Sequence, residues 1–129
     1  MNFLDRIKST LQSEMVDSWK IITNTSQLDE AEAISYEKPV ILFKHSVSCG
    51  ISAAAKYRLE QNWSDLEADV EFYYLDLLAY RPISNEIASR YKVIHQSPQV
   101  IILKGGVAVY DNSHHMISIA ALNTAIATL

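Results

Sequence analysis

Residues 40–52 read VILFKHSVSCGIS and are followed by an alanine-rich run. The continuous apolar run at 40–43 predicts a central strand that is buried on both faces of a sheet. After Cys49, apolar residues recur every four positions, which marks one face of a helix; they are Ile51, Ala55, Leu59 and Trp63. The stretch therefore predicts a strand, a short polar loop and a helix that begins at Cys49.

Strands and helices are predicted to alternate over the rest of the chain. Thr25-Ser26 before an acidic stretch and Pro82 each signal the start of a helix, and two β-rich runs around Gly105-Gly106 predict a hairpin. The other predicted elements are strands at 19–22 and 70–77 and helices at 27–34, 83–91 and 117–129. The order β-α-β-α-β-α-β-β-α is the thioredoxin layout. The expected fold class is therefore α/β and thioredoxin-like, with a central mixed β-sheet flanked by helices.

The N-terminal segment has a pattern of its own. We expect residues 1–18 to form an amphipathic helical arm and residues 19–129 to form the thioredoxin-like domain. Apolar residues recur in the arm at helical spacing; they are Phe3, Leu4, Ile7, Leu11 and Met15. Because acidic residues interrupt this narrow stripe, the arm is expected to pack on the domain or on a partner subunit rather than to anchor the chain in a membrane.

The composition of the chain bounds its class and its partners. It has 129 residues, of which 49% are hydrophobic and 20% charged, as is usual for one globular domain. A formal net charge of −4, with scattered basic residues, argues against a nucleic-acid partner. No apolar run approaches the roughly 20 residues of a membrane span, and charges interrupt the N-terminus where a signal peptide needs an apolar region. With a single cysteine no internal disulfide can form, so we expect a cytoplasmic protein with a reduced thiol.

Cys49 is the candidate catalytic residue. The thiolate is the reactive form of cysteine, and the unpaired N–H groups at a helix N-terminus favour it. Gly50 leaves room beside the sulfur for a substrate. Ser52 occupies the position at which a Cys-x-x-Cys pair has its second cysteine, and both residues are expected to support the site. The alternative is that Cys49 is a small buried apolar residue that happens to precede a helix.

Pro98 favours thiol chemistry over that alternative. It follows Ser97 at the start of the predicted strand 99–103, where thioredoxin-like folds hold a cis-proline beside the active sulfur. A proline at this position presents an extended backbone to a substrate instead of a closed ladder. We therefore expect Ser97 and Pro98 to support Cys49 in the active site.

Four further residues are candidates for contacts with a substrate. Lys44 and His45 lie upstream of the cysteine and add positive potential. Arg81 is expected in a loop, where it either pairs with a substrate carboxylate or is solvated. His95 lies in the loop before the proline and either lines the mouth of the site or has a capping or core role. No metal site is expected, because adjacent histidines such as those at 114–115 rarely converge on one ion.

Several short motifs accompany the cysteine. They are Lys44-His45-Ser46, Cys49-x-Ile51-Ser52, Ser84-Asn85-x-Ile87-Ala88, Val93-x-His95-x-Ser97-Pro98-Gln99 and Tyr110-x-x-Ser113-His114. With these motifs the chain resembles the YtxJ-type monothiol bacilliredoxins from about Trp19 to its C-terminus. The usual active-site tetrapeptide of that family is Cys-Pro-Ile-Ser, and here Gly50 replaces the proline.

The resemblance implies a monothiol thiol-disulfide oxidoreductase that removes bacillithiol from mixed disulfides on protein cysteines. Cys49 would attack the bacillithiol sulfur and carry the bacillithiol, which a second low-molecular-weight thiol or a reductase would then clear. Bacillithiol would be a thiol co-substrate, and no tightly bound cofactor is implied. Two alternatives stay open. Cys-Gly-x-Ser is also similar to the monothiol glutaredoxins that hold an iron–sulfur cluster between two subunits, and a thioredoxin-fold interaction module would leave Cys49 inert.

Overall fold

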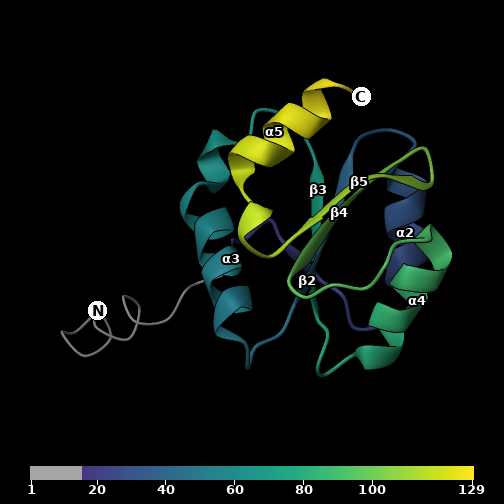
Figure 1. Ribbon diagram of the computed structural model, residues 1–129. Helices are drawn as coiled ribbons and strands as arrows, with labels where there is room; N and C mark the ends of the chain where they lie inside the picture. Colours follow the sequence, from purple (N-terminus) through teal and green to yellow (C-terminus); the bar gives the residue numbers. More distant parts are fainter. Residues whose placement is uncertain (1–15) are drawn as a thin grey trace.

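The computed structural model describes residues 16–129 (Figure 1). Its five strands form one sheet in the order β1-β3-β2-β4-β5. The strands are β1 (Lys20–Ile21), β2 (Val40–His45), β3 (Glu71–Asp76), β4 (Gln99–Lys104) and β5 (Val107–Ser113). The helices are α2 (Ser26–Ile34), α3 (Gly50–Gln61), α4 (Arg81–Tyr91) and α5 (Ile119–Ala127), with 3-10 turns η1 (Trp63–Asp65) and η2 (His114–Met116). This order of elements confirms the one predicted from the sequence.

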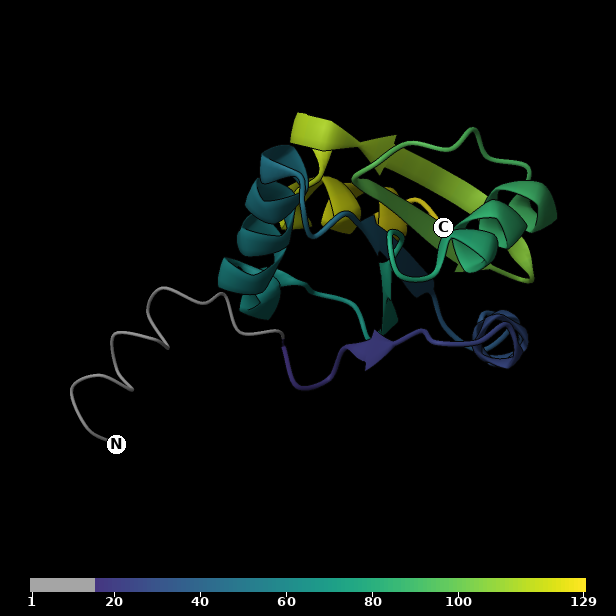
Figure 2. The ribbon, with the colours of Figure 1, turned by 90° about the horizontal axis from the view of Figure 1, so that it is seen from below.

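The sheet is mixed and lies between two layers of helices. β1 and β2 pair parallel to β3, β4 pairs antiparallel to β2, and β5 pairs antiparallel to β4. Helices α3 and α5 cover one face and α2 and α4 the other, and Figure 2 shows both layers from below. Helix α3 is the crossover that the parallel neighbours β2 and β3 require. The expected thioredoxin-like α/β class is confirmed.

Strand β2 lies in the middle of this sheet, and all six of its residues are buried. Because successive side chains of a strand point to opposite faces, Ile41 and Phe43 pack with α3 and α5, whereas Val40 and Leu42 pack with α2 and α4. The strand continues beyond the predicted apolar run through residues 44–45. The side chains of Lys44 and His45, both titratable, are therefore buried in the interior.

The β4–β5 hairpin turns at Gly105 and Gly106, as predicted. Their φ angles are +61° and +79°, and glycine adopts this left-handed region without the penalty that a side chain brings. The turn is also tied to the end of α2, because Gly105 N–H donates to the Ser35 carbonyl at 2.8 Å and Gly106 N–H donates to Ser35 Oγ at 2.8 Å.

Helix α2 begins at Ser26 as predicted, but its cap differs from the expected one. The Thr25 side chain makes no capping hydrogen bond. Instead, Asn24 Oδ1 accepts from the Gln27 N–H and Gln27 Oε1 accepts from the Asn24 N–H, each at 3.2 Å. This reciprocal arrangement is that of a capping box, and it satisfies two backbone donors that the threonine hydroxyl alone would leave open.

The buried face of α3 also differs from the predicted one. Ser52, Ala55 and Leu59 are buried, whereas Ile51 is 57% exposed. Residues three apart and residues four apart both lie on one helix face. In the first turn of α3 the buried residues, Ser52 and Ala55, are three apart. Ser52 consequently points into the protein, and Ile51 lies at the surface next to the cysteine.

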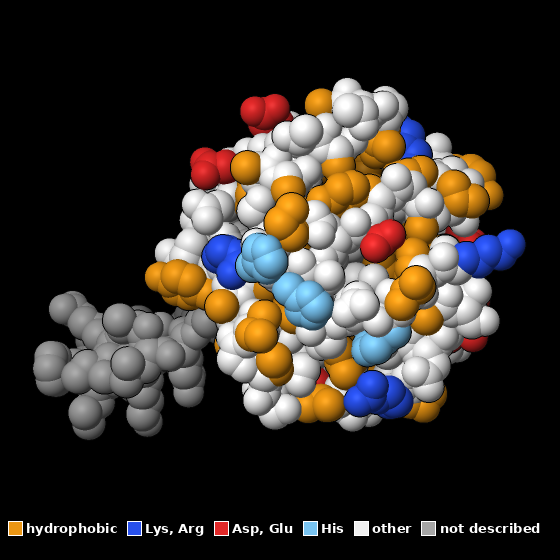
Figure 3. Space-filling view, viewed as in Figure 1, with side chains coloured by type: hydrophobic (Ala, Val, Ile, Leu, Met, Phe, Trp, Pro, Cys, Tyr) orange, Lys and Arg blue, Asp and Glu red, His pale blue; other side chains and the backbone are white. Residues whose placement is uncertain are grey.

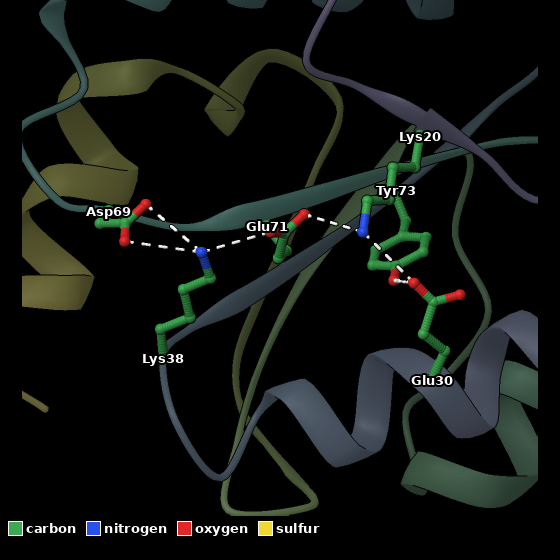
Figure 4. Close-up of polar contacts among 6 residues, drawn as sticks. All are labelled: Lys20, Glu30, Lys38, Asp69, Glu71 and Tyr73. Carbon is green, nitrogen blue, oxygen red and sulfur yellow. Dashed lines mark hydrogen bonds and ion pairs between the residues drawn. The ribbon is translucent and has the colours of Figure 1, made fainter.

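Figure 4 shows a network of charged side chains near the end of the sheet where β2 and β3 begin. Glu71 pairs with Lys20 and with Lys38, each at 3.2 Å, and Lys20 pairs with Glu30 at 3.2 Å. The Tyr73 hydroxyl donates to Glu30 at 3.0 Å, and burial together with this bond raises the pKa of Tyr73 to about 12. Partly exposed pairs of this kind contribute about 0.2–1 kcal/mol each. The network is remote from the β2–α3 loop.

The predicted arm at 1–18 lies almost entirely outside the described residues. Trp19, which follows it, is 4% exposed and stacks on Phe72 with ring centroids 4.2 Å apart. The core therefore includes the first residue of the predicted domain, while the helical arm and the boundary after residue 18 stay predictions. Between residues 16 and 129, no helix is long and apolar enough to cross a membrane.

Candidate active site

Cys49 lies immediately before α3, at its N-cap position. Its backbone is extended, with φ −106° and ψ 124°, and its side chain is partly exposed. The Cys49 N–H donates to the Ser46 carbonyl at 3.1 Å, which closes the loop after β2. The Cys49 carbonyl accepts from the Ala53 N–H at 3.0 Å, the first hydrogen bond of the helix. The helix thus begins at the sulfur-bearing residue, as predicted.

The environment of Cys49 favours its thiolate. The backbone N–H groups of Ser52 and Ile51 lower the pKa of the Cys49 thiol below its ordinary value, and the Ser52 hydroxyl adds to them. Partial burial opposes these groups by disfavouring the charged form, but the net shift is downward. The physical cause is the one anticipated for a helix N-terminus, where N–H groups have no partner within the helix.

Ser52 stands where a second cysteine would stand in a dithiol site. It is fully buried, and its Oγ accepts a hydrogen bond from the Ser46 N–H at 3.3 Å. Because a hydroxyl has a single hydrogen to donate, this acceptor bond leaves that hydrogen free to point at the sulfur. Ser52 therefore connects the loop after β2 to the thiol, and it cannot itself form a disulfide.

Ser97 and Pro98 lie at the same end of the sheet as Cys49. Lys44, near the end of β2, pairs with Gln99, so the residues before Gln99 lie beside the β2–α3 loop. The Ser97–Pro98 peptide bond is cis, as expected of a thioredoxin-like fold. The Ser97 Oγ is buried and has no hydrogen-bond partner among residues 16–129.

Gly50 has open space on its side-chain side. A Cβ atom added there would have no heavy atom within 4 Å beyond its immediate neighbours. The glycine is therefore not demanded by a close contact within the protein. The open space is consistent with the room for a substrate that the sequence suggested.

Lys44 is a buried cation on the α4 side of the sheet. Its side chain is fully buried, and its Nζ lies 2.8 Å from His95 Nδ1. Burial, followed by the positive charge of Arg81, lowers the pKa of Lys44 to about 8. The two predicted substrate contacts Lys44 and His95 are thus brought together, although they are 51 residues apart in the sequence.

His95 and Arg81 lie at the surface above this lysine. Arg81 is the first residue of α4 rather than part of a loop, and both side chains are exposed. Burial, followed by the charges of Lys44 and Arg81, lowers the pKa of His95. Figure 3, in the view of Figure 1, shows a histidine next to a Lys or Arg side chain near the lower edge of the molecule. The three residues form a group of cationic or donor side chains, the Lys44–Arg81–His95 cluster.

His45 lies on the opposite face of the sheet. It is 4% exposed, and its Nδ1 lies 3.1 Å from the Tyr74 hydroxyl. Burial, followed by the charge of Lys56, lowers the pKa of His45 to about 4, although Asp76 acts in the other direction. The imidazole is therefore neutral at physiological pH and adds no positive potential. Its contact with a substrate stays a prediction.

Gln99 is a residue of the site that the sequence analysis did not single out. It is fully buried; its Nε2 donates to the Ile94 carbonyl at 3.0 Å, and its Oε1 accepts from the Gln96 N–H at 3.4 Å. These bonds hold the loop that carries His95 and leads to Pro98. The sequence could have indicated this role, because Gln99 is a polar residue at the start of an otherwise mostly apolar strand. A buried polar side chain needs hydrogen-bond partners in the interior.

Within residues 16–129, no group of three or more His, Cys, Asp or Glu side chains is placed to hold a metal ion.

Solved structures similar to this chain share the thioredoxin fold. An inferred oxidoreductase with a thioredoxin fold is 28% identical, with a TM-score of 0.72 over 84% of this chain and 93% of that chain. Spinach chloroplast thioredoxin F is 21% identical, with a TM-score of 0.66 over 91% and 97% of the two chains. Mitochondrial thioredoxin 3 from Saccharomyces cerevisiae is 18% identical, with a TM-score of 0.65 over 87% and 96%. The last two likenesses show the fold alone.

The family described as monothiol bacilliredoxin BrxC matches residues 20–122. The match includes Cys49, the cis-proline and the loop between α4 and β4, and it extends over most of the chain. It supports a thiol redox function. The chain belongs to the monothiol bacilliredoxin BrxC family.

Proposed function

We propose that the protein removes bacillithiol from mixed disulfides on protein cysteines, with Cys49 as its nucleophile. The observation that carries the proposal is the position of Cys49 at the start of α3, where the N–H groups of Ser52 and Ile51 lower the pKa of its thiol. Membership of the bacilliredoxin family supports the choice of bacillithiol. The reaction needs a reduced thiol, which fits the cytoplasm.

The first step is an exchange between a thiolate and a disulfide. The Cys49 thiolate attacks the bacillithiol sulfur of the mixed disulfide, and a new bond forms between these two sulfur atoms. The bond to the protein sulfur breaks, and the released protein thiolate takes up a proton from water. Cys49 then carries the bacillithiol. The open space beside Gly50 supports this adduct.

The second step needs a thiol from outside the chain. Cys49 is the only cysteine in the sequence, and the Ser52 hydroxyl cannot attack a disulfide. A second low-molecular-weight thiol, such as bacillithiol itself, attacks the bacillithiol sulfur of the adduct. The products are a low-molecular-weight disulfide and the Cys49 thiolate, so the cycle uses no tightly bound cofactor.

Intact-mass measurement after incubation with bacillithiol disulfide tests this proposal. We expect the mass of the chain to rise by one bacillithiol. The Ser52→Ala variant is expected to form the same adduct, because the sulfur and the two backbone N–H groups remain. The control is free cysteine, the amino acid, under the same conditions. If free cysteine reacts and the mass of the wild-type chain stays unmodified, the proposal is contradicted.

A further inference from the structure

Lys44 carries a buried charge without a carboxylate beside it. An ammonium group has three hydrogens to donate and no capacity to accept. In the described part of the chain, Lys44 Nζ forms no ion pair, and its one hydrogen-bond partner is His95 Nδ1 at 2.8 Å. Buried charges are normally paired, so this site lacks an anion.

The contact with Lys44 fixes which way His95 presents its proton. Because Lys44 can only donate, His95 Nδ1 accepts, and a neutral imidazole must then carry its hydrogen on Nε2. The lowered pKa of His95 agrees with a neutral ring. Ser84 Oγ lies 3.4 Å from the same Nδ1 atom and is buried with Lys44. The exposed His95 ring therefore offers an N–H donor away from the lysine.

Arg81 extends this donor arrangement to the surface. Its positive charge acts on both Lys44 and His95, and its side chain forms no ion pair or hydrogen bond with another residue between 16 and 129. Gln99 holds the loop that carries His95, and that loop leads directly to Pro98 beside Cys49. Three positive or donor groups without an anion thus lie next to the reacting end of the sheet, in a chain of net charge −4.

We propose that the Lys44–Arg81–His95 cluster is a carboxylate-binding subsite for the small-thiol portion of the disulfide substrate. The inference rests on the proposed function, because it assigns a partner to the same sulfur. A carboxylate seated there accepts from the Arg81 guanidinium and the exposed imidazole N–H, while Lys44 beneath supplies positive charge. The protein should then react faster with disulfides that carry carboxylates than with neutral ones.

Two symmetrical disulfides of similar size distinguish binding at this subsite from the reaction at the Cys49 thiol. One is 3,3′-dithiodipropionate, which carries two carboxylates, and the other is bis(2-hydroxyethyl) disulfide, which is neutral. The second-order rate of mixed-disulfide formation at Cys49 is followed by intact mass for each probe. In Arg81→Gln and Lys44→Met we expect the rate with the carboxylate probe to fall about fivefold or more, as for loss of one partly exposed charge pair. The ratio of the carboxylate-probe rate to the neutral-probe rate should fall by the same factor, because only the carboxylate probe uses the subsite.

Lys104→Gln is the matched control, because it removes one positive charge from an exposed residue at the far end of β4. It should leave both rates unaltered. Equal loss in Lys104→Gln and Arg81→Gln, or an unchanged ratio of the two rates in Arg81→Gln, would overturn the subsite while leaving the proposed function in place. No reaction of the wild-type chain with either probe would overturn both. Arg81 is exposed, so the outcome does not depend on whether Lys44→Met folds.

Discussion

Replacing Cys49 with serine is expected to abolish the removal of bacillithiol from a mixed disulfide. The rate should fall at least about 10³-fold, to that of the uncatalysed exchange, because a serine hydroxyl stays protonated at neutral pH and does not attack a disulfide. The measurement is release of the free thiol from a protein–bacillithiol mixed disulfide in the presence of excess bacillithiol.

The same variant provides its own structural control. Cys49 is the N-cap residue of α3, and serine is among the residues preferred at that position. Cys49→Ser should therefore unfold at a denaturant midpoint no lower than that of the wild-type chain. A stable variant that kept the wild-type rate would show that the sulfur is not the nucleophile.

Replacing Phe43 with alanine is expected to reduce the free energy of unfolding by about 3–5 kcal/mol. Phe43 is fully buried in β2 and lies between the rings of Trp19, Phe72 and Tyr74, with centroids 6.1–6.4 Å away. The loss combines the transfer of the ring to water with the cavity that it leaves. Since domains of this size are stable by about 5–15 kcal/mol in total, the midpoint of urea unfolding should fall markedly.

Tyr57→Ala is the matched comparison for the Phe43 substitution. Tyr57 is also aromatic, but it is 55% exposed on α3, and surface substitutions usually change stability by about 0.5 kcal/mol or less. Equal shifts for the two variants would contradict the assignment of Phe43 to the centre of the core.

The order of elements and the place of the cysteine could be predicted because they depend on local pattern. The apolar run of β2, the glycine pair at 105–106 and the serine-proline pair at 97–98 each indicate their conformation within a few residues. The position of Cys49 at the start of α3 followed from the same short-range signals. The two layers of helices then follow from the alternation of strands and helices.

The remaining features of the site depend on contacts between distant segments. A basic pair at 44–45 suggested a common role, yet the strand places Lys44 on one face of the sheet and His45 on the other, because successive side chains alternate. The contact of Lys44 with His95 spans 51 residues and depends on how α4 is seated on the sheet. Ile51 fits the four-residue spacing of the apolar residues in α3. In the folded chain, however, Ser52 is buried and Ile51 is exposed.

The most direct test of the thiolate at Cys49 is the pH dependence of its alkylation by iodoacetamide. Cys49 is the single cysteine of the chain, so the whole signal belongs to it. Because the N–H groups of Ser52 and Ile51 lower the pKa of the thiol, we expect the midpoint in the folded protein to lie below the value of about 8.5 for an unperturbed cysteine. The chain unfolded in urea should return to that ordinary value. A folded-state midpoint at or above 8.5 would contradict the account.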